Sequence, residues 1–214
     1  MTLHGDLRVV EDVPRACADL VASERPGSLA LSGGTTAREC YELFATADVD
    51  WGSVEIFFGD ERWVPVDDPE SNEGMARLAF IDRVTPAVVH SMRGAGETIE
   101  AAAGAYDRLL RDHEPVDLVH LGLGPDGHTA SLFPGSPTLD EHDRLVVPTG
   151  DDLHAHPRLT WTYPAIARSR LVVFTVAGEE KRDALTRIKD GDDLPAAQVT
   201  ADRVVWLVDD AANG

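Results

Sequence analysis

The sequence predicts a single α/β domain of the Rossmann-like kind, with a mostly parallel sheet flanked by helices. Helical and strand patterns alternate along the chain, and its 214 residues fit one compact core. Residues 133–143 and 150–157 are rich in Gly, Pro and Asp, but neither stretch separates two cores. We read both stretches as surface loops and expect residues 1–214 to form one domain.

The first quarter of the chain establishes the alternation. Residues 9–22 carry apolar side chains at helical spacing and predict an entry helix, and residues 28–31 predict a short strand. Thr36 and Glu39 then fit a capping box, in which a threonine and a glutamate three residues later satisfy free amides at a helix N-terminus. A second helix is therefore expected to begin there.

The rest of the chain repeats these patterns. Residues 54–58 predict a strand, which a long polar loop follows. Residues 99–110 predict an amphipathic helix, and residues 116–121 predict a strand that ends at a glycine-rich turn. The remaining expected elements are a helix at about residues 180–189 and strands at residues 145–147, 159–162, 171–176 and 204–208.

The turn after residue 121 carries the strongest candidate for a catalytic site. It places Asp126 and His128 two residues apart on a glycine turn, at the carboxyl end of a strand, where open α/β sheets bind their ligands. Because an imidazole titrates near neutral pH, His128 is the candidate general base that deprotonates a water molecule. The spacing does not by itself establish contact between the two side chains, and a lone histidine beside a turn is usually a polar surface residue.

A second candidate is the glycine loop of residues 32–36, Ser-Gly-Gly-Thr-Thr, between a strand and a helix start. Free backbone amides, the positive end of the helix dipole and the hydroxyl groups suit a phosphate there. The alternative is a tight turn with a helix cap and no ligand. The loop is not a Walker loop, because no lysine follows the glycines.

Charged residues after the strand at 54–58 form the third candidate. Asp60, Glu61 and Arg62 are expected at the same sheet edge as the glycine-rich turn, although a solvated charge cluster is the ordinary interpretation. Arg62 suits a phosphate or a developing oxyanion. In a chain with a net charge of −19, an anionic substrate requires a locally cationic site, so Arg158 and Lys181 are further candidates. Each could equally be a surface charge.

The charge balance argues against nucleic acid as a partner. The chain has 38 acidic and 19 basic residues and no basic stripe. No segment approaches the ~18 consecutive apolar residues of a membrane helix, and the start has no basic region followed by an apolar run. We expect a cytoplasmic protein without membrane contact, monomeric or weakly homo-oligomeric. Lysine occurs only at Lys181 and Lys189, which fits either a halophilic host or a GC-rich genome that favours arginine, and activity measured across salt concentration separates the two.

No metal or cofactor is predicted. Residues 122–127 formally match the dinucleotide fingerprint Gly-x-Gly-x-x-Gly, but Pro and Asp inside it put rigidity and negative charge where a pyrophosphate would lie. His154 and His156 lack a matching third ligand cluster. Cys17 and Cys40 give no disulfide or zinc framework, so both are expected to be reduced and to fill space on helices.

Two blocks of sequence resemble the signatures of the 6-phosphogluconolactonase family. Residues 126–134, Asp-Gly-His-Thr-Ala-Ser-Leu-Phe-Pro, are similar to one signature, and residues 58–65, Phe-Gly-Asp-Glu-Arg-Trp-Val-Pro, are similar to the other. The resemblance implies hydrolysis of 6-phospho-D-glucono-1,5-lactone to 6-phospho-D-gluconate, a step of the oxidative pentose phosphate pathway, without a cofactor. Shorter matches extend it over nearly the whole chain, at residues 31–36, 157–160, 178–181 and 205–209.

The resemblance also implies roles for individual residues. His128 is the implied general base, Arg62 contacts the substrate, and Asp126 and Asp60 orient groups or act electrostatically. The implied residues for binding substrate and phosphate are Ser32, Gly33, Gly34, Thr35, Thr36, Arg158, Lys181, Gly127 and Thr129.

Two rival functions stay open. Aminosugar-phosphate deaminases or isomerases resemble this chain in the glycine loop and the Asp-Gly-His turn, but they continue with Asn-Glu-Pro, whereas residues 131–134 contain no acid. A sugar-phosphate sensor domain without catalysis is the other rival. The chain also departs from the family pattern at Ala167, where similar proteins usually show an Asn-rich turn, and Arg168 is the candidate that could substitute for the missing polar side chain.

Overall fold

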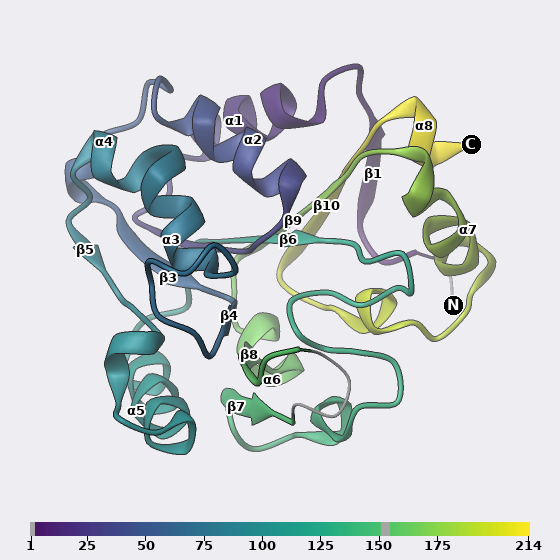
Figure 1. The fold of residues 1–214 in the computed structure, drawn as a ribbon. Helices are drawn as coiled ribbons and strands as arrows, with labels where there is room; N and C mark the ends of the chain where they lie inside the picture. The colour runs from purple at the N-terminus through teal and green to yellow at the C-terminus, as the bar shows by residue number, and fades with distance from the viewer. Residues whose placement is uncertain (1–2, 151–154) are drawn as a thin grey trace.

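The computed structural model describes residues 3–150 and 155–214, and it confirms the predicted α/β class. The main sheet has seven strands in the order β1-β10-β9-β6-β2-β3-β5, and every neighbouring pair is parallel (Figure 1). In chain order the strands of this sheet are β1 (Asp6–Val9), β2 (Ser28–Leu31), β3 (Glu55–Phe58), β5 (Val88–Val89), β6 (Leu118–Gly122), β9 (Leu171–Val176) and β10 (Arg203–Val208).

Helices cover both faces of this sheet. Figure 1 shows α1 to α4 above the sheet and α5 and α6 below it, with α7 and α8 together at the end beside β1. The helices are α1 (Val13–Glu24), α2 (Thr35–Phe44), α3 (Asn72–Ala76), α4 (Asp82–Val84), α5 (Ile99–Asp112), α6 (Tyr163–Ala167), α7 (Arg182–Asp190) and α8 (Asp210–Asn213).

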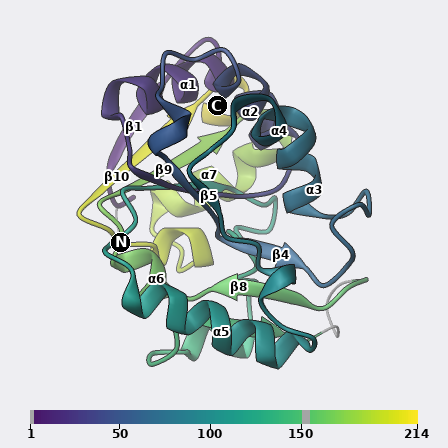
Figure 2. The ribbon, with the colours of Figure 1, turned by 90° about the vertical axis from the view of Figure 1, so that its left-hand side faces the viewer.

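A small antiparallel sheet lies between the main sheet and α5, as Figure 2 shows from the side. Its strand order is β4 (Asp60–Arg62), β8 (Arg158–Trp161) and β7 (Val146–Thr149). Gly59 joins the two sheets, because its N–H donates to Leu31 of β2 at 2.8 Å and its carbonyl accepts from Trp161 of β8 at 2.8 Å. The strand that leaves the main sheet as β3 therefore continues directly into β4.

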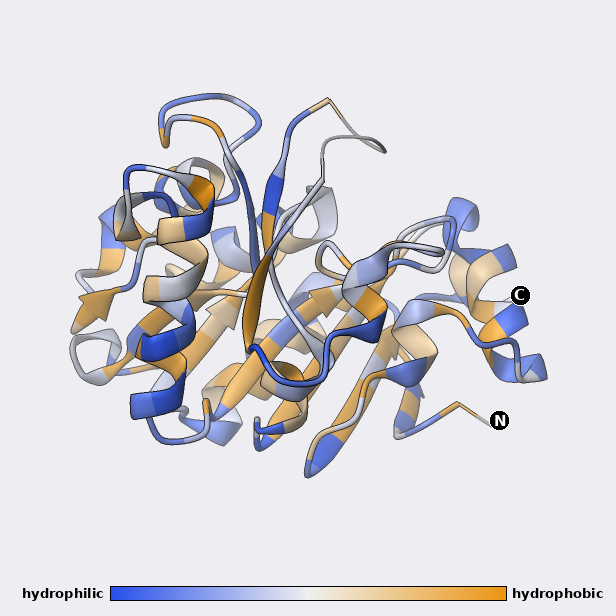
Figure 3. Cartoon of the chain, turned by 90° about the horizontal axis from the view of Figure 1, so that it is seen from below, coloured by the Kyte–Doolittle hydropathy of each residue, from blue (hydrophilic) through white to orange (hydrophobic). Residues whose placement is uncertain are grey.

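The core consists of apolar strand side chains enclosed by the apolar faces of the helices. All six residues of β9 are buried, and Phe174 stacks on Trp206 of β10 with ring centroids 3.8 Å apart. Figure 3 shows the strands predominantly hydrophobic, whereas polar residues gather on the outer helix faces and loops. Cys17 and Cys40 are buried free cysteines on α1 and α2, as expected.

The N-terminal prediction is wrong at its start. Residues 6–9 form the edge strand β1, and the helix begins only at Val13, after the N-cap Asp12 accepts a hydrogen bond from the backbone N–H of Arg15. Three of the four β1 residues are exposed, so its sequence carries little hydrophobic alternation. Its place as a strand depends on pairing with β10, nearly two hundred residues away.

Two further local predictions are corrected. The capping box is wrong, because the N-cap of α2 is Gly34, which has φ +105° and no side-chain cap, and Thr36 lies inside the helix. The long loop after Pro65 contains α3, a π-helical segment at Arg77–Ile81 and α4. Among the described residues, no helix has the length and apolarity that crossing a membrane requires.

Candidate active site

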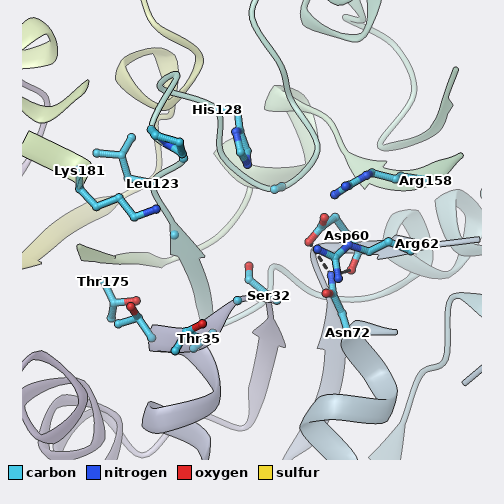
Figure 4. Close-up of a pocket in the computed structure, with 18 residues that line it drawn as sticks. Ser32, Thr35, Asp60, Arg62, Asn72, Leu123, His128, Arg158, Thr175 and Lys181 are labelled. Carbon is cyan, nitrogen blue, oxygen red and sulfur yellow. Dashed lines mark hydrogen bonds between the residues drawn. The ribbon is translucent and has the colours of Figure 1, made fainter. Parts of the chain in front are cut away.

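The carboxyl ends of β2, β6 and β9 meet β4 and β8 around an open pocket of about 200 Å³ (Figure 4). This is the sheet edge at which the predicted site residues were expected to gather. The lining residues are Ser32, Gly33, Gly34, Thr35, Thr36, Ala37, Asp60, Arg62, Asn72, Gly122, Leu123, Gly124, Pro125, His128, Ala130, Arg158, Thr175 and Lys181.

Asp126 and His128 form a direct hydrogen bond at one wall of this pocket. The Nδ1 atom of His128 lies 2.5 Å from Oδ1 of Asp126, which also accepts from the backbone N–H of His128 at 3.1 Å. Burial raises the pKa of Asp126, but the backbone N–H and the imidazole of His128 outweigh it and hold that pKa below its usual range. An ionised carboxylate accepts only, so we assign the proton of neutral His128 to Nδ1, and Nε2 is left as the basic nitrogen.

The glycines of the turn set the position of this imidazole. A Cβ atom on Gly124 would lie 2.1 Å from Nδ1 of His128, so the ring packs directly on the bare backbone there. Gly127 has φ +86°, a conformation that favours glycine, and a Cβ on it would meet Leu194. Phe133 packs against the imidazole, with ring centroids 4.5 Å apart.

Two residues expected to touch the substrate support the turn and do not line the pocket. Thr129 is buried, and its hydroxyl donates to the carbonyl of Gly122 at 2.9 Å. The N–H of Gly127 donates to Gly124 at 3.0 Å, and its carbonyl accepts from Ala196. Both residues therefore hold the shape of the turn that carries His128.

The glycine loop forms the floor of the pocket, and all five of its residues line it. Gly34 precedes the ten-residue helix α2, so the free amides of the first turn open toward the pocket with no side-chain cap competing for them. Thr35 and Thr36 also line the pocket and add hydroxyl groups at the same place.

A buried polar network fixes the start of this loop. The hydroxyl of Tyr41 accepts from the N–H of Ser32 at 2.8 Å, lies 3.0 Å from its carbonyl and contacts Nδ1 of His120 at 2.9 Å. The hydroxyl of Ser32 donates to the carbonyl of His120 at 2.6 Å. The Nε2 atom of His120 reaches Oγ1 of Thr175 at 2.8 Å, so one imidazole links the loop to β9.

The two acids after β3 separate in space. Asp60 lines the pocket, and its carboxylate accepts from Asn72 at 3.1 Å and from the hydroxyl of Ser131 at 2.7 Å. Glu61 points away and caps α3, because its carboxylate accepts from the N–H groups of Asn72 and Glu73, each at 2.7 Å. Burial raises the pKa of Glu61 to about 7, against the lowering effect of these donors. Asp60 therefore lines the pocket with both of its carboxylate oxygens hydrogen-bonded, whereas Glu61 supports the start of α3.

Two arginines stand opposite each other at the other wall. Arg62 of β4 pairs with Arg158 of β8 in the antiparallel register, and both line the pocket. The Nε atoms of both guanidinium groups are buried without a hydrogen-bond partner among the described residues. Burial lowers the pKa of Arg158, and the charge of Arg62 lowers it further. Like charges directly opposite across strands repel, so the pair concentrates positive charge at this wall of the pocket.

The remaining basic residues divide between the pocket and the surface. Lys181 lies at the N-cap of α7 and reaches into the pocket (Figure 4). Arg168 instead lies beside a separate hollow with Glu114 and donates to the carbonyl of His113 at 3.4 Å. The expectation that Arg168 substitutes for a polar side chain at Ala167 is therefore wrong, because its guanidinium group lies outside the pocket.

The pocket also contains residues that sequence reasoning missed. Thr175 is the fifth residue of a correctly expected strand, and its place near the carboxyl end was the available signal. Asn72 lies in a segment interpreted as loop, and nothing in the sequence connects it to Asp60, twelve residues earlier.

One group of potential metal ligands occurs in the described part of the chain. Single ligand atoms of Cys17, Cys40 and His120 lie within 4.8 Å of one another, all buried. Both ring nitrogens of His120 already contact hydroxyl groups, of Tyr41 and Thr175. The histidine of this group is thus committed to protein partners. His156 is intermediate in burial, and His154, its neighbour in the sequence pattern, lies outside the described residues.

Comparison with known proteins gives concordant results. Residues 7–206 match the family described as Glucosamine-6-phosphate isomerases/6-phosphogluconolactonase. A 6-phosphogluconolactonase from Synechocystis sp. is 42% identical over 208 residues, covering 90% of this chain and 86% of the relative. The crystal structure of 6-phosphogluconolactonase from Thermotoga maritima has a TM-score of 0.86 at 30% identity, covering 95% of this chain and 99% of that one. A monomeric glucosamine-6-phosphate deaminase has a TM-score of 0.82 at 20% identity, a likeness of fold alone.

Proposed function

Because the chain belongs to the family of glucosamine-6-phosphate isomerases and 6-phosphogluconolactonases, we propose that it hydrolyses 6-phospho-D-glucono-1,5-lactone to 6-phospho-D-gluconate. The observation that carries the proposal is the hydrogen bond between Asp126 and His128 at the pocket wall. It leaves a basic nitrogen beside a cationic pocket, which suits attack of water on an ester in an anionic substrate. The reaction consumes only water and requires no cofactor.

The first step is the attack of water on C1 of the lactone. Nε2 of His128 takes one proton from the water as its oxygen bonds to C1, and the carbonyl oxygen becomes an oxyanion. Asp126 stabilises the imidazolium that forms, because its carboxylate accepts from the Nδ1–H. Arg62 is assigned to stabilise the oxyanion, since it lines the pocket and its buried Nε makes no hydrogen bond among the described residues.

The second step opens the ring. The tetrahedral intermediate collapses, the bond between C1 and the ring oxygen breaks, and protonated His128 returns its proton to that oxygen. The products are a free hydroxyl group and a carboxylic acid, which loses its proton to solvent at neutral pH. His128 ends each cycle as a neutral base.

The phosphate would be held by the glycine-loop amides together with basic side chains. The free N-terminus of α2, Lys181 and Arg158 lie around the pocket and supply the positive charge for this in a chain with net charge −19, while Arg62 is reserved for the oxyanion. Asp60 is assigned to orient neighbouring groups, because its carboxylate is already occupied by Asn72 and Ser131.

A comparison of two substrates tests the proposal. NMR follows the decay of freshly made 6-phosphogluconolactone, with and without the protein, and in parallel the fate of glucosamine 6-phosphate. We expect acceleration of the lactone alone, because the segment after His128 supplies a serine and no second acid for a proton shuttle. Turnover of glucosamine 6-phosphate, or a lactone rate equal to the uncatalysed rate, would contradict the proposal.

A further inference from the structure

Three of the described residues that line the pocket each carry a buried polar atom without a partner. Among the described residues, Nε of Arg62, Nε of Arg158 and Oδ1 of Asn72 make no hydrogen bond, and all three residues line the pocket. A buried polar group without a partner is destabilising, so three such groups on residues around one pocket call for a partner that a ligand can supply. The two arginine atoms are donors, and the asparagine atom is an acceptor.

The orientation of the Asn72 amide is determined by Asp60. Its Nδ2 donates to the backbone carbonyl of Asp60 at 2.9 Å and to Oδ1 of the same residue at 3.1 Å. Both partners are acceptors only, and the other carboxylate oxygen already accepts from Ser131. If the oxygen and nitrogen of the amide were exchanged, the amide oxygen would lie against the carbonyl oxygen and Oδ1 of Asp60 with no hydrogen between them. Oδ1 of Asn72 must therefore face away from Asp60.

The backbone of Asn72 is equally fixed. Asn72 is the first residue of α3, and its N–H donates to buried Glu61 at 2.7 Å. Its side chain is covered by the glycine loop, because a Cβ atom on Gly33 would lie 2.0 Å from Oδ1. Asn72 is only 2% exposed. The acceptor is thus held rigidly between the loop and the arginine pair, as Figure 4 shows from the pocket side.

We propose that Asn72 is a specificity-determining residue whose Oδ1 accepts a hydrogen bond from a hydroxyl group of the sugar. The inference rests on the proposed function and adds to it a role for a residue outside the catalytic set. An amide oxygen offers lone pairs and no hydrogen, so it binds a hydroxyl group and repels a phosphoryl or carboxylate oxygen. The neighbouring Arg62 and Arg158 offer only donors. Together they select a ligand in which a hydroxyl group lies beside anionic or carbonyl oxygens.

Deoxy analogues of the product test this inference. Calorimetry measures the dissociation constants of 6-phosphogluconate and of its 2-, 3- and 4-deoxy forms with the wild-type protein, Asn72→Ala and Asn72→Ser. We expect one deoxy form to bind the wild-type protein about 5- to 20-fold more weakly than the parent compound, because Oδ1 is left unpaired. In Asn72→Ala the ratio of the two dissociation constants is expected to fall below about twofold, since the acceptor is gone. In Asn72→Ser the ratio is also expected to fall, because the shorter hydroxyl group does not reach the position of Oδ1.

Ser131→Ala is the matched control, because it removes the other donor to Asp60 and leaves Asn72 in place. Ser131→Ala should keep the wild-type ratio between the dissociation constants of the deoxy form and of 6-phosphogluconate. If Ser131→Ala binds 6-phosphogluconate and the deoxy form with nearly equal affinity, as Asn72→Ala is expected to do, then Asn72 acts only by holding Asp60 and the inference is wrong. The inference is also wrong if Asn72→Ala lowers the affinity for all four ligands by the same factor. It is equally wrong if the wild-type protein binds all three deoxy forms as tightly as 6-phosphogluconate. Failure of the proposed function itself is a separate result: a folded wild-type protein that does not accelerate lactone decay.

Discussion

Gly124→Ala should disable the catalytic histidine while leaving the fold intact. The added methyl group would lie 2.1 Å from Nδ1 of His128, where ordinary contact begins at 3.4 Å. The ring must therefore move by at least about 1.3 Å, which breaks its 2.5 Å hydrogen bond to Asp126, and a displacement of this size costs roughly 10²-fold in rate. Gly124 does not have a positive φ, so alanine adds no backbone strain.

The assay is the NMR decay of the lactone, corrected for uncatalysed hydrolysis and accompanied by thermal denaturation of each variant. Gly104→Ala is the control, because it changes a glycine inside α5 where a Cβ meets only the end of Arg108 at 3.7 Å. It should keep the full rate and raise stability by about 0.5–1 kcal/mol. A folded Gly124→Ala protein with wild-type kcat would refute the reasoning that the position of His128 limits the rate.

Three other substitutions probe the site and its supporting network. Arg158→Met should raise KM for the lactone by roughly 10-fold or more, since it removes a charge-assisted hydrogen bond, whereas Arg168→Met, outside the pocket, should leave steady-state kinetics unchanged. Asp126→Asn should lower kcat by as much as about 10⁴-fold, because an amide in place of the carboxylate favours the wrong tautomer of the imidazole. The pKa of Asp126 in the folded protein lies below its usual 3.8, so its ionised carboxylate stabilises the fold above pH 3.8 and this stabilisation disappears as the pH falls through the folded value. The free energy of unfolding of the wild-type protein should therefore fall more on acidification below pH 3.8 than that of Asp126→Asn. The difference should be under about 1 kcal/mol, because the Asp126 side chain is half-exposed. His120→Leu should lower the melting temperature by roughly 3–10 °C in calorimetry, because buried hydroxyl groups are left without their partner, and an unchanged melting temperature would contradict the role of that network.

The sequence was sufficient where local pattern and structure agree. The apolar runs at β2 and β9 are strands, and the amphipathic segment at α5 is a helix, because burial on the predicted faces reinforces the local preference. The glycine turn after β6 lies at the pocket as predicted, since a strand end fixes where such a turn must lie.

The errors arise where distant contacts determine the structure. β1 is a strand because β10 offers it an edge, and its four residues carry no sufficient pattern of their own. α3 forms because Glu61, outside the helix, accepts the N–H groups of its first turn. Asn72 could not be identified from its sequence position for the same reason, because only the path of β4 brings Asp60 against it.

The central claim is that His128 activates water in a lactone-hydrolysing site. It is tested most directly by the NMR decay of freshly generated 6-phosphogluconolactone alone, with the wild-type protein and with His128→Ala. The account predicts clear acceleration by the wild-type protein and a loss of roughly 10²- to 10⁴-fold of that acceleration in a variant with an unchanged melting temperature. A folded His128→Ala protein that hydrolyses the lactone at the wild-type rate would contradict it.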